Sequence, residues 1–406
     1  MSLKLAIDGG TPIRTTPMPT WPVYNDADIA AIADVLHSGT ANYWTGTSGR
    51  ALEAEYAASL GRKHAIAVAN GTVALELALR AFGIGVGDEV VVPARTFIAT
   101  ASSVVAVGAT PVVADIDLDS GTLTAATIEA VLTPQTAAII AVHLGGWPAD
   151  IASISRLAES RGLVVIEDCA QAHGAIRDGR QVGAPGTHAA AFSFCQDKII
   201  SAGEGGMLVL DDDAAFNRAA AYKDHGKSPD RLAELSDDGP RTTFRWLADS
   251  FGTNWRMHEV AAVLVRGGLA RLPQMLAARR ANALRLATQL AATPGLRVSL
   301  PADGAQSAFY RLYAYVRPDE LAPGWDRDRI ITAITAEGVK CQYGSCCEIY
   351  REHAFVDAGF GPGHRLPNAS ATHETCIAFF VHPTLGDADI DDTAAAVLKV
   401  MEAATA

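Results

Sequence analysis

The sequence has no excess of basic residues and no long apolar run, and each absence excludes a class of protein. Its 406 residues include 33 Lys and Arg against 45 Asp and Glu, a formal net charge of −12. That balance argues against nucleic acid or an anionic membrane surface as the main partner. No segment is expected to span a bilayer, and the first residues lack the apolar core of a signal peptide.

The sequence is also poor in cysteine. Its six cysteines are scattered, and only Cys346 and Cys347 are adjacent, with no CxxC spacing. A disulfide framework is therefore not expected, and a reducing, cytoplasmic setting is. The adjacent pair has no spaced cysteine or histidine partners in a recognised arrangement, so we expect no metal site.

What the sequence does contain is a regular alternation of short apolar runs with helical patterns. The runs are rich in Val, Ile and Ala and begin at about residue 65. Continuous apolar strands separated by helices predict an α/β domain with a largely parallel sheet covered on both faces. The runs predicted as strands are 65–70, 88–93, 110–116, 137–144, 163–168, 189–194 and 207–212.

The pattern changes after a polar segment at 228–243, which we predict to be a surface excursion. A long helical pattern covers about 257–292, and an antiparallel type of strand follows at 309–317. The chain is therefore predicted to have three parts. They are an N-terminal arm (1–25), a large domain that includes the long helix (26–293) and a small C-terminal α+β domain (294–406).

Polar residues follow the predicted strands, where ligands of open α/β sheets bind. Asn70 can cap the helix after the first strand, and Gly71 and Thr72 would offer backbone N–H groups and a hydroxyl to a phosphate. Plain helix capping is the alternative. Phe97, after the second strand, could stack on a flat ring or be a core residue.

Two charged residues complete the pattern. Asp168 ends a strand, where a carboxylate can keep a ring nitrogen protonated or cap a turn. Lys198 follows the run 189–194, and a lysine there is costly to bury unless its amine is used. A phosphate site, a stacking ring, a carboxylate and an amine are the contacts that pyridoxal phosphate (PLP) requires. We therefore predict that Lys198 is buried because it is bound to this cofactor, with the glycines of 203–206 allowing close backbone approach behind it.

Six motifs, in this order along the chain, resemble the DegT/StrS family of aminotransferases, and the likeness runs from about Trp21 to at least Gln274. The resemblance implies the fold of aspartate aminotransferase (PLP fold type I), with a large domain and a smaller α+β domain. It also implies PLP-dependent transfer of an amino group from L-glutamate or L-glutamine to a keto-sugar. The motifs are NGTVALELAL, PARTFIATASSV, HLGGWPADI, IEDCAQAHGA, SFCQDKIISAGEGG and GTNWRMHEVAA.

The resemblance implies roles for individual residues. Lys198 looks like the lysine that forms a Schiff base with the cofactor and then moves a proton, and Asp168 like the partner of the pyridine nitrogen. Asn254 looks like a phosphate ligand donated by the neighbouring subunit, which implies a homodimer with shared active sites. The other implied cofactor contacts are Gln171 beside the ring hydroxyl, Phe97 on the ring face, and Gly71, Thr72 and Ser193 at the phosphate.

The substrate region departs from the family pattern. Family members acting on nucleotide-linked sugars usually have a histidine where Gln342 stands, although Tyr343 is present, and "GSCC" at 344–347 replaces another expected histidine. A nucleotide-linked keto-sugar is the expected acceptor. A free keto-cyclitol, or a dehydratase similar to 3-amino-5-hydroxybenzoate synthase, stays open as an alternative.

Three residues are further candidates for substrate contact. His173 follows the Asp168 motif, Arg256 follows Asn254 and could meet a carboxylate, and Tyr343 belongs to the substrate region. A lone histidine is more often structural, and a surface salt bridge is the alternative for Arg256.

Overall fold

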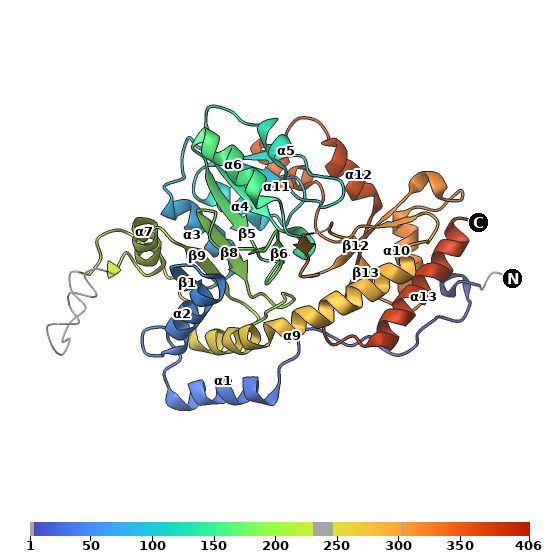
Figure 1. The fold of residues 1–406 in the computed structure, drawn as a ribbon, viewed down its shortest axis with the longest axis horizontal. Helices are drawn as coiled ribbons and strands as arrows, with labels where there is room; N and C mark the ends of the chain where they lie inside the picture. Colours follow the sequence, from blue (N-terminus) through green and yellow to red (C-terminus); the bar gives the residue numbers. More distant parts are fainter. Residues whose placement is uncertain (1–3, 230–246, 303) are drawn as a thin grey trace.

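The computed structural model describes residues 4–229, 247–302 and 304–406, and Figure 1 shows two sheets connected along one side by a long helix. Of the polar segment 228–243, predicted as a surface excursion, only 228–229 are described.

A seven-stranded sheet forms the centre of the larger part of the molecule. Its order is β1-β9-β8-β5-β4-β2-β3, and neighbours from β8 to β3 are parallel, whereas β9 is antiparallel to both of its neighbours. The prediction of a largely parallel sheet is therefore confirmed. The strands are β1 (His64–Val68), β2 (Glu89–Pro93), β3 (Thr110–Ala114), β4 (Thr136–Val142), β5 (Val164–Asp168), β8 (Ala189–Ser193) and β9 (Gly206–Leu210).

The reversal of β9 has a local cause. β8 ends at Ser193 and β9 begins at Gly206, with no helix between them. A parallel return needs a crossover of about a dozen residues or more, usually helical, so the chain folds back beside β8 instead. The connecting loop therefore stays at the carboxyl end of β8, and it carries Lys198 there.

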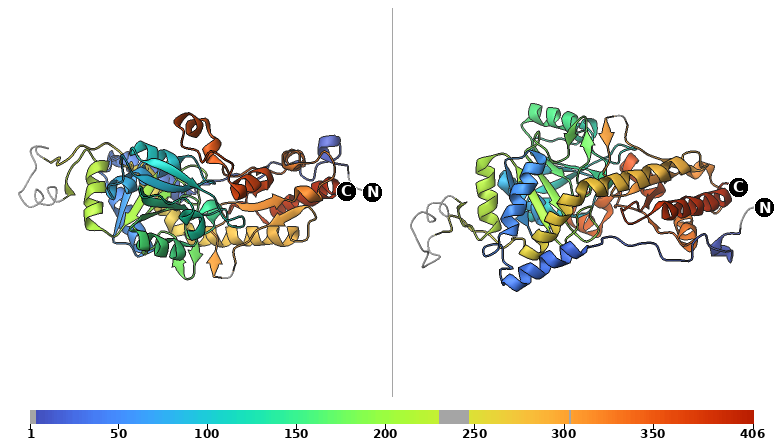
Figure 2. Two further views of the ribbon diagram at one scale, coloured as in Figure 1. Left: turned by 90° about the horizontal axis from the view of Figure 1, so that it is seen from above. Right: turned by 60° about the horizontal axis from the view of Figure 1, so that its bottom comes forward.

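Helices cover both faces of this sheet (Figure 2). Side chains alternate along a strand, so Ile66 and Val68 of β1 pack with one group of helices while Ala65 and Ala67 pack with the other. The first group is α3 (Gly71–Ala81), α4 (Ala99–Ala106) and α7 (Asp213–Lys223). The second is α2 (Ser48–Leu60), α5 (Ala125–Glu129), α6 (Ile151–Arg161) and the first half of α9 (Glu259–Leu290).

A smaller antiparallel sheet has the order β10-β12-β14-β13. The strand predicted at 309–317 is β12, and it is antiparallel to both neighbours, as expected. Helices α10 (Arg327–Ala336) and α13 (Asp387–Ala404) share its core with the end of α9. Its strands are β10 (Leu296–Val298), β12 (Leu312–Val316), β13 (Cys341–Gln342) and β14 (Cys376–Phe379).

Among the described residues, the remaining elements are a small third sheet, three helices and four 3₁₀ turns. A three-stranded sheet joins β11 (Ala305–Gln306), β6 (Ile176–Arg177) and β7 (Arg180–Gln181). The other helices are α1 (Asp26–Ser38), α11 (His353–Ala358), α12 (Pro367–Thr375) and the 3₁₀ turns η1 (Ala6–Asp8), η2 (Leu144–Gly146), η3 (Pro318–Glu320) and η4 (Ile349–Arg351).

The segment from η4 to α12 belongs to the predicted small domain by sequence, yet it packs on the large sheet. Ile349, Phe355 and Leu366 lie in one apolar cluster with residues of α3 and α4. The loop that precedes this segment is thereby held at the carboxyl ends of the large sheet's strands. The domain division at residue 293 stays a prediction.

Helix α9 is long and apolar enough, by length and composition alone, to cross a membrane, contrary to the expectation that no segment would be. A core helix of a folded domain passes the same test. Here α9 contacts α1, α2 and α13, and the side chains of Arg279 and Leu286 in its second half are fully buried.

A buried carboxylate fastens the start of α9 to the start of α2. Glu259 accepts hydrogen bonds from the backbone N–H groups of Ser48 (2.6 Å) and Gly49 (2.9 Å), and it is 1% exposed. A Cβ on Gly46 would lie 2.2 Å from its Cδ. The negative charge also suits the N-terminal end of the α2 dipole.

Glu259→Ala is expected to lower the free energy of unfolding by about 2–4 kcal/mol, because two N–H groups lose a charged acceptor. Urea denaturation of the variant and the wild type measures the difference. Glu259→Gln keeps one acceptor oxygen and is expected to lose less. An alanine variant as stable as the wild type would contradict this account.

Candidate active site

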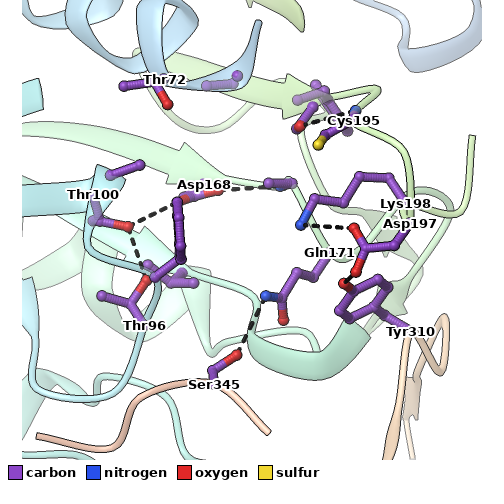
Figure 3. Close-up of a pocket in the computed structure, with 18 of the residues that line it drawn as sticks. Thr72, Thr96, Thr100, Asp168, Gln171, Cys195, Asp197, Lys198, Tyr310 and Ser345 are labelled. Atoms are coloured by element: carbon purple, nitrogen blue, oxygen red, sulfur yellow. Dashed lines mark hydrogen bonds and ion pairs between the residues drawn. The ribbon is translucent and has the colours of Figure 1, made fainter. Parts of the chain in front are cut away.

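The carboxyl ends of the large sheet's strands open into a cavity of about 780 Å³. One wall consists of residues that follow β1, β2, β5 and β8 (Figure 3). The opposite wall comes from residues around the small sheet, namely Tyr310, Arg311, Tyr313, Gln342, Gly344 and Ser345. The predicted cofactor-binding residues that line this cavity are Gly71, Thr72, Phe97, Asp168, Gln171, Ser193 and Lys198.

The start of α3 lies at the cavity and could hold an anion. The Asn70 side chain caps the helix by accepting from the Val73 N–H at 3.0 Å, as predicted. Gly71 is needed here, since a Cβ on it would lie 2.7 Å from the Cβ of Ser193. A Cβ on Gly206 would lie 2.2 Å from the carbonyl oxygen of Asn70, so the expected close backbone approach at 203–206 is present. The exposed N–H groups of this helix end suit a phosphate.

Asp168 is a buried carboxylate at the end of β5, 7% exposed. It accepts from the Ala170 N–H at 3.1 Å and from the Thr100 hydroxyl at 3.0 Å. Burial raises the pKa of its carboxyl, against these hydrogen bonds and the charge of Lys198, which lower it. Within the described part of the chain Asp168 forms no ion pair, so its environment fits a protonated ring nitrogen supplied by a ligand.

Lys198 lies in the turn after β8, held there by a hydrogen bond from the Trp21 indole to its carbonyl oxygen (2.9 Å). Its side chain is 15% exposed, and its Nζ lies 3.9 Å from Asp197 Oδ1 and 4.9 Å from the ring centre of Tyr310. Lys198 is therefore only partly buried, and the prediction that it is buried is wrong. The amine faces the cavity, as it must if it is to react with a molecule that enters there.

Gln171 joins the two walls. It is 8% exposed, its Oε1 accepts from the Gly145 N–H at 2.7 Å, and its Nε2 donates to the Ser345 hydroxyl at 3.4 Å. Gly145 has a φ of +63°, which favours glycine. Phe97 is on the same rim, and its ring is 67% exposed.

His173 does not line the cavity, contrary to its expected contact with substrate. It is 1% exposed, and its Nε2 donates to the Ser193 carbonyl at 3.0 Å while its Nδ1 lies 3.1 Å from the Tyr56 hydroxyl. Burial lowers its pKa to about 4, so it is neutral near pH 7. Its contacts support the end of β8, which is a structural role.

Arg256, Tyr343 and Asn254 also lie outside the cavity of their own chain. Arg256 forms an ion pair with Asp224. The ring of Tyr343 is half exposed, with the Arg327 guanidinium 4.4 Å from its centre. Asn254 is exposed and forms a backbone bridge with Asp224.

The sequence reasoning missed several cavity residues, and three of them form a cluster. Asp197, Tyr310 and Arg311 contact one another in the wall beside Lys198. The position of Asp197 directly before the lysine was a usable signal. The other two come from a segment more than a hundred residues later, so only the fold brings them here.

A second buried group has ligands of the kinds that metals bind. Donor atoms of His143, Glu167 and Cys169 lie within 4.8 Å of one another. The carboxylate of Glu167, however, already accepts hydrogen bonds from His143 (2.9 Å), Arg180 (2.6 Å) and Thr187 (2.7 Å). Both oxygens of Glu167 are therefore already used within the protein, in an internal salt bridge.

Because burial raises the pKa of Asp168, its charge costs stability at neutral pH. A carboxyl with a raised folded-state pKa favours folding below its unfolded pKa of about 3.9 and loses that contribution as pH rises through the folded value. Asp168→Asn is therefore expected to raise the melting temperature of the ligand-free protein at pH 7, with the gain disappearing towards pH 4. Calorimetry at both pH values measures this, and a less stable variant at pH 7 would contradict it.

Known proteins resemble this chain over nearly its whole length. Residues 22–398 match the DegT/DnrJ/EryC1/StrS aminotransferase family. The L-glutamine:2-deoxy-scyllo-inosose aminotransferase of Streptoalloteichus tenebrarius is 34% identical, over 99% of this chain and 98% of that one.

Two solved structures have the same fold. An aminotransferase from Psychrobacter cryohalolentis is 46% identical with a TM-score of 0.90, covering 94% of this chain and 98% of that one. The 3-amino-5-hydroxybenzoic acid synthase is 29% identical with a TM-score of 0.85, covering 96% and 100%. The chain therefore belongs to the DegT/DnrJ/EryC1/StrS aminotransferase family, as a PLP-dependent aminotransferase of fold type I.

Proposed function

We propose that this enzyme transfers an amino group from L-glutamine or L-glutamate to the ketone of a sugar or cyclitol. The observation that carries the proposal is the meeting of the Lys198 amine, the Asp168 carboxylate and the start of α3 in one cavity. The relative from Streptoalloteichus, whose name gives glutamine as donor and a cyclitol ketone as acceptor, supports the substrate class.

Different cavity residues would contact different parts of PLP. When bound, this cofactor supplies an electron-accepting ring and carries the amino group between the two substrates. Asp168 would keep the ring nitrogen protonated, and Lys198 would move a proton between the substrate's α-carbon and the cofactor. The other proposed contacts are Gln171 at the ring hydroxyl, Phe97 on the ring face, and Gly71, Thr72 and Ser193 at the phosphate.

The acceptor is the less defined of the two substrates. A nucleotide-linked keto-sugar is the first candidate from the family pattern, and the cyclitol named for the Streptoalloteichus relative supports a free keto-cyclitol. The likeness to 3-amino-5-hydroxybenzoic acid synthase supports a dehydratase as a third candidate. The wall at Gln342, Gly344 and Ser345 is small and polar, which suits a hydroxylated ring in each case.

A panel of ketones tests the proposal. We expect L-glutamine or L-glutamate to convert the cofactor of the purified enzyme to its amino form, and one group of ketones, nucleotide-linked sugars or free cyclitols, to reverse the absorbance change. Product mass then separates amination from dehydration. Lys198→Ala is expected to bind the cofactor but to lower turnover by about 10²–10⁴-fold or more. Normal turnover by that variant would disprove the assignment of Lys198.

We further propose that the enzyme is a cytoplasmic homodimer with shared active sites, in which Asn254 reaches the phosphate in the partner's cavity. Asn254 is exposed and lies outside the cavity of its own chain, which a role in trans would explain. The neighbouring Phe251 is 99% exposed, as an apolar side chain waiting for a partner surface would be. The six unpaired cysteines suit a reducing compartment.

Mixed dimers test the role of Asn254 in trans. Lys198→Ala and Asn254→Ala are each expected to impair activity as homodimers. Coexpression of the two variants should restore activity, because the mixed dimer then contains one site with both residues intact and one with neither. If Asn254 serves its own chain, every site in the mixed dimer has one defect, and activity stays at the level of the single variants.

A further inference from the structure

Among the charged residues of the cavity wall, Arg311 and Asp197 are not among the proposed cofactor contacts. We propose that Arg311 and Asp197 form a recognition pair, in which Arg311 binds the α-carboxylate of the amino-acid donor and Asp197 accepts hydrogen bonds from hydroxyl groups of the ketone. The inference rests on the proposed function, and it assigns to this pair the two substrates that use the cavity in turn.

Arg311 is fixed in position just before β12. Its side chain is 10% exposed, and its Cζ lies 4.2 Å from the ring centre of Tyr310 and 4.3 Å from that of Phe380. One Nη1 hydrogen is donated to the Tyr310 carbonyl oxygen at 2.9 Å. A guanidinium stacked on two rings keeps its plane and points its N–H edges in set directions.

Asp197 is held at the other side of the pair. Its Oδ2 accepts from the Tyr310 hydroxyl and, at 3.3 Å, from Arg311 Nη2, while its Oδ1 lies 3.9 Å from Lys198 Nζ. Figure 3 shows the carboxylate between the lysine amine and the Tyr310 ring. Its side chain is nevertheless 48% exposed, so part of the carboxylate remains available to a molecule in the cavity.

Among the described residues that line the cavity, Arg311 is the cation available to bind a donor carboxylate. Lys198 and Arg311 are the cationic residues among the described residues that line the cavity, and Lys198 is used by the chemistry. The hydrogen bonds to Tyr310 and Asp197 take two of the five guanidinium donors, and the others can grip a carboxylate as a fork. Arg311 and Lys198 both contact the carboxylate of Asp197, which places the two cations on the same side of the cavity as an α-amino acid's carboxylate and amine require.

When the ketone is bound, Arg311 needs a negative charge from the protein instead of from the substrate. An uncharged ring brings no carboxylate, and a poorly solvated guanidinium without a counter-charge is costly. Asp197 supplies that counter-charge once the oxo acid has left, and its open surface can accept hydrogen bonds from ring hydroxyls. The pair thus adapts one cavity to a donor that carries a carboxylate and then to a ketone ring that carries none.

The test compares L-glutamine with its α-amide, in which an uncharged amide of similar shape replaces the carboxylate, as donors to the holoenzyme. The wild type is expected to react with the amide about a hundredfold less efficiently, as for loss of one partner of a desolvated charge pair. Arg311→Gln is expected to lose about a hundredfold with glutamine and little with the amide, so that the discrimination disappears. Arg311→Lys should restore part of it, because the charge remains without the fork.

Two further variants make the result specific. Arg317→Gln removes an exposed arginine at the other end of β12 and is expected to change neither donor rate. Asp197→Asn is expected to slow the half-reaction with the ketone that the wild type accepts more than the half-reaction with glutamine. The proposal of a recognition pair is wrong if Arg311→Gln still discriminates between glutamine and its α-amide. It is also wrong if Asp197→Asn slows both half-reactions equally.

The outcome is separable from that of the proposed function. If the wild type reacts with no amino-acid donor, the proposed function fails and the pair fails with it. If the wild type turns over and Arg311→Gln still prefers glutamine to the amide as strongly, the function stands and the pair alone fails.

Discussion

The candidate active site depends on the buried carboxylate of Asp168, which forms no ion pair among the described residues. Asp168 and Glu167 are adjacent on β5 and therefore point to opposite faces of the sheet. Burial acts to raise the pKa of both carboxyls. For Glu167, hydrogen bonds from His143 and Arg180 outweigh burial and the pKa falls, whereas for Asp168 the pKa remains raised. The protein itself therefore stabilises the charge of Glu167, whereas a cationic ligand would stabilise the charge of Asp168.

The rest of the site follows from where that carboxylate ends its strand. Parallel strands present their carboxyl ends at one edge, so the start of α3 and the loop after β8 meet Asp168 across the same cavity. The antiparallel return of β9 holds the loop, and Lys198 with it, at that edge. Gly71 and Gly206 then let α3, β8 and β9 approach closely enough to close that end of the cavity.

The sequence predicted the parts of the site that depend on local pattern. Asn70, Asp168 and Lys198 follow apolar runs, and the sheet topology brings strand ends together without further information. His173 was misjudged because its neighbours in sequence lie in the cavity wall, while its own side chain turns into the core towards Tyr56. Neither the exposure of a side chain nor its partner on another element can be read from spacing.

The opposite wall could not be predicted for a related reason. Arg311 meets Asp197 only because the small sheet docks against the loop after β8, and Ser345 meets Gln171 only because 349–369 packs on the large sheet.

The two walls of the cavity also differ in how strongly a substitution in them would disturb the fold. The cofactor wall is built from strand ends and a helix start of the main core, so its residues are tied to the fold. The facing wall consists of side chains at the edge of a second sheet, and these can change without disturbing Asp168 or α3. Such a division explains how one family can keep its cofactor chemistry while its acceptors differ. Specificity is therefore to be sought at Arg311 on the facing wall and at Asp197, which Arg311 contacts from the loop after β8.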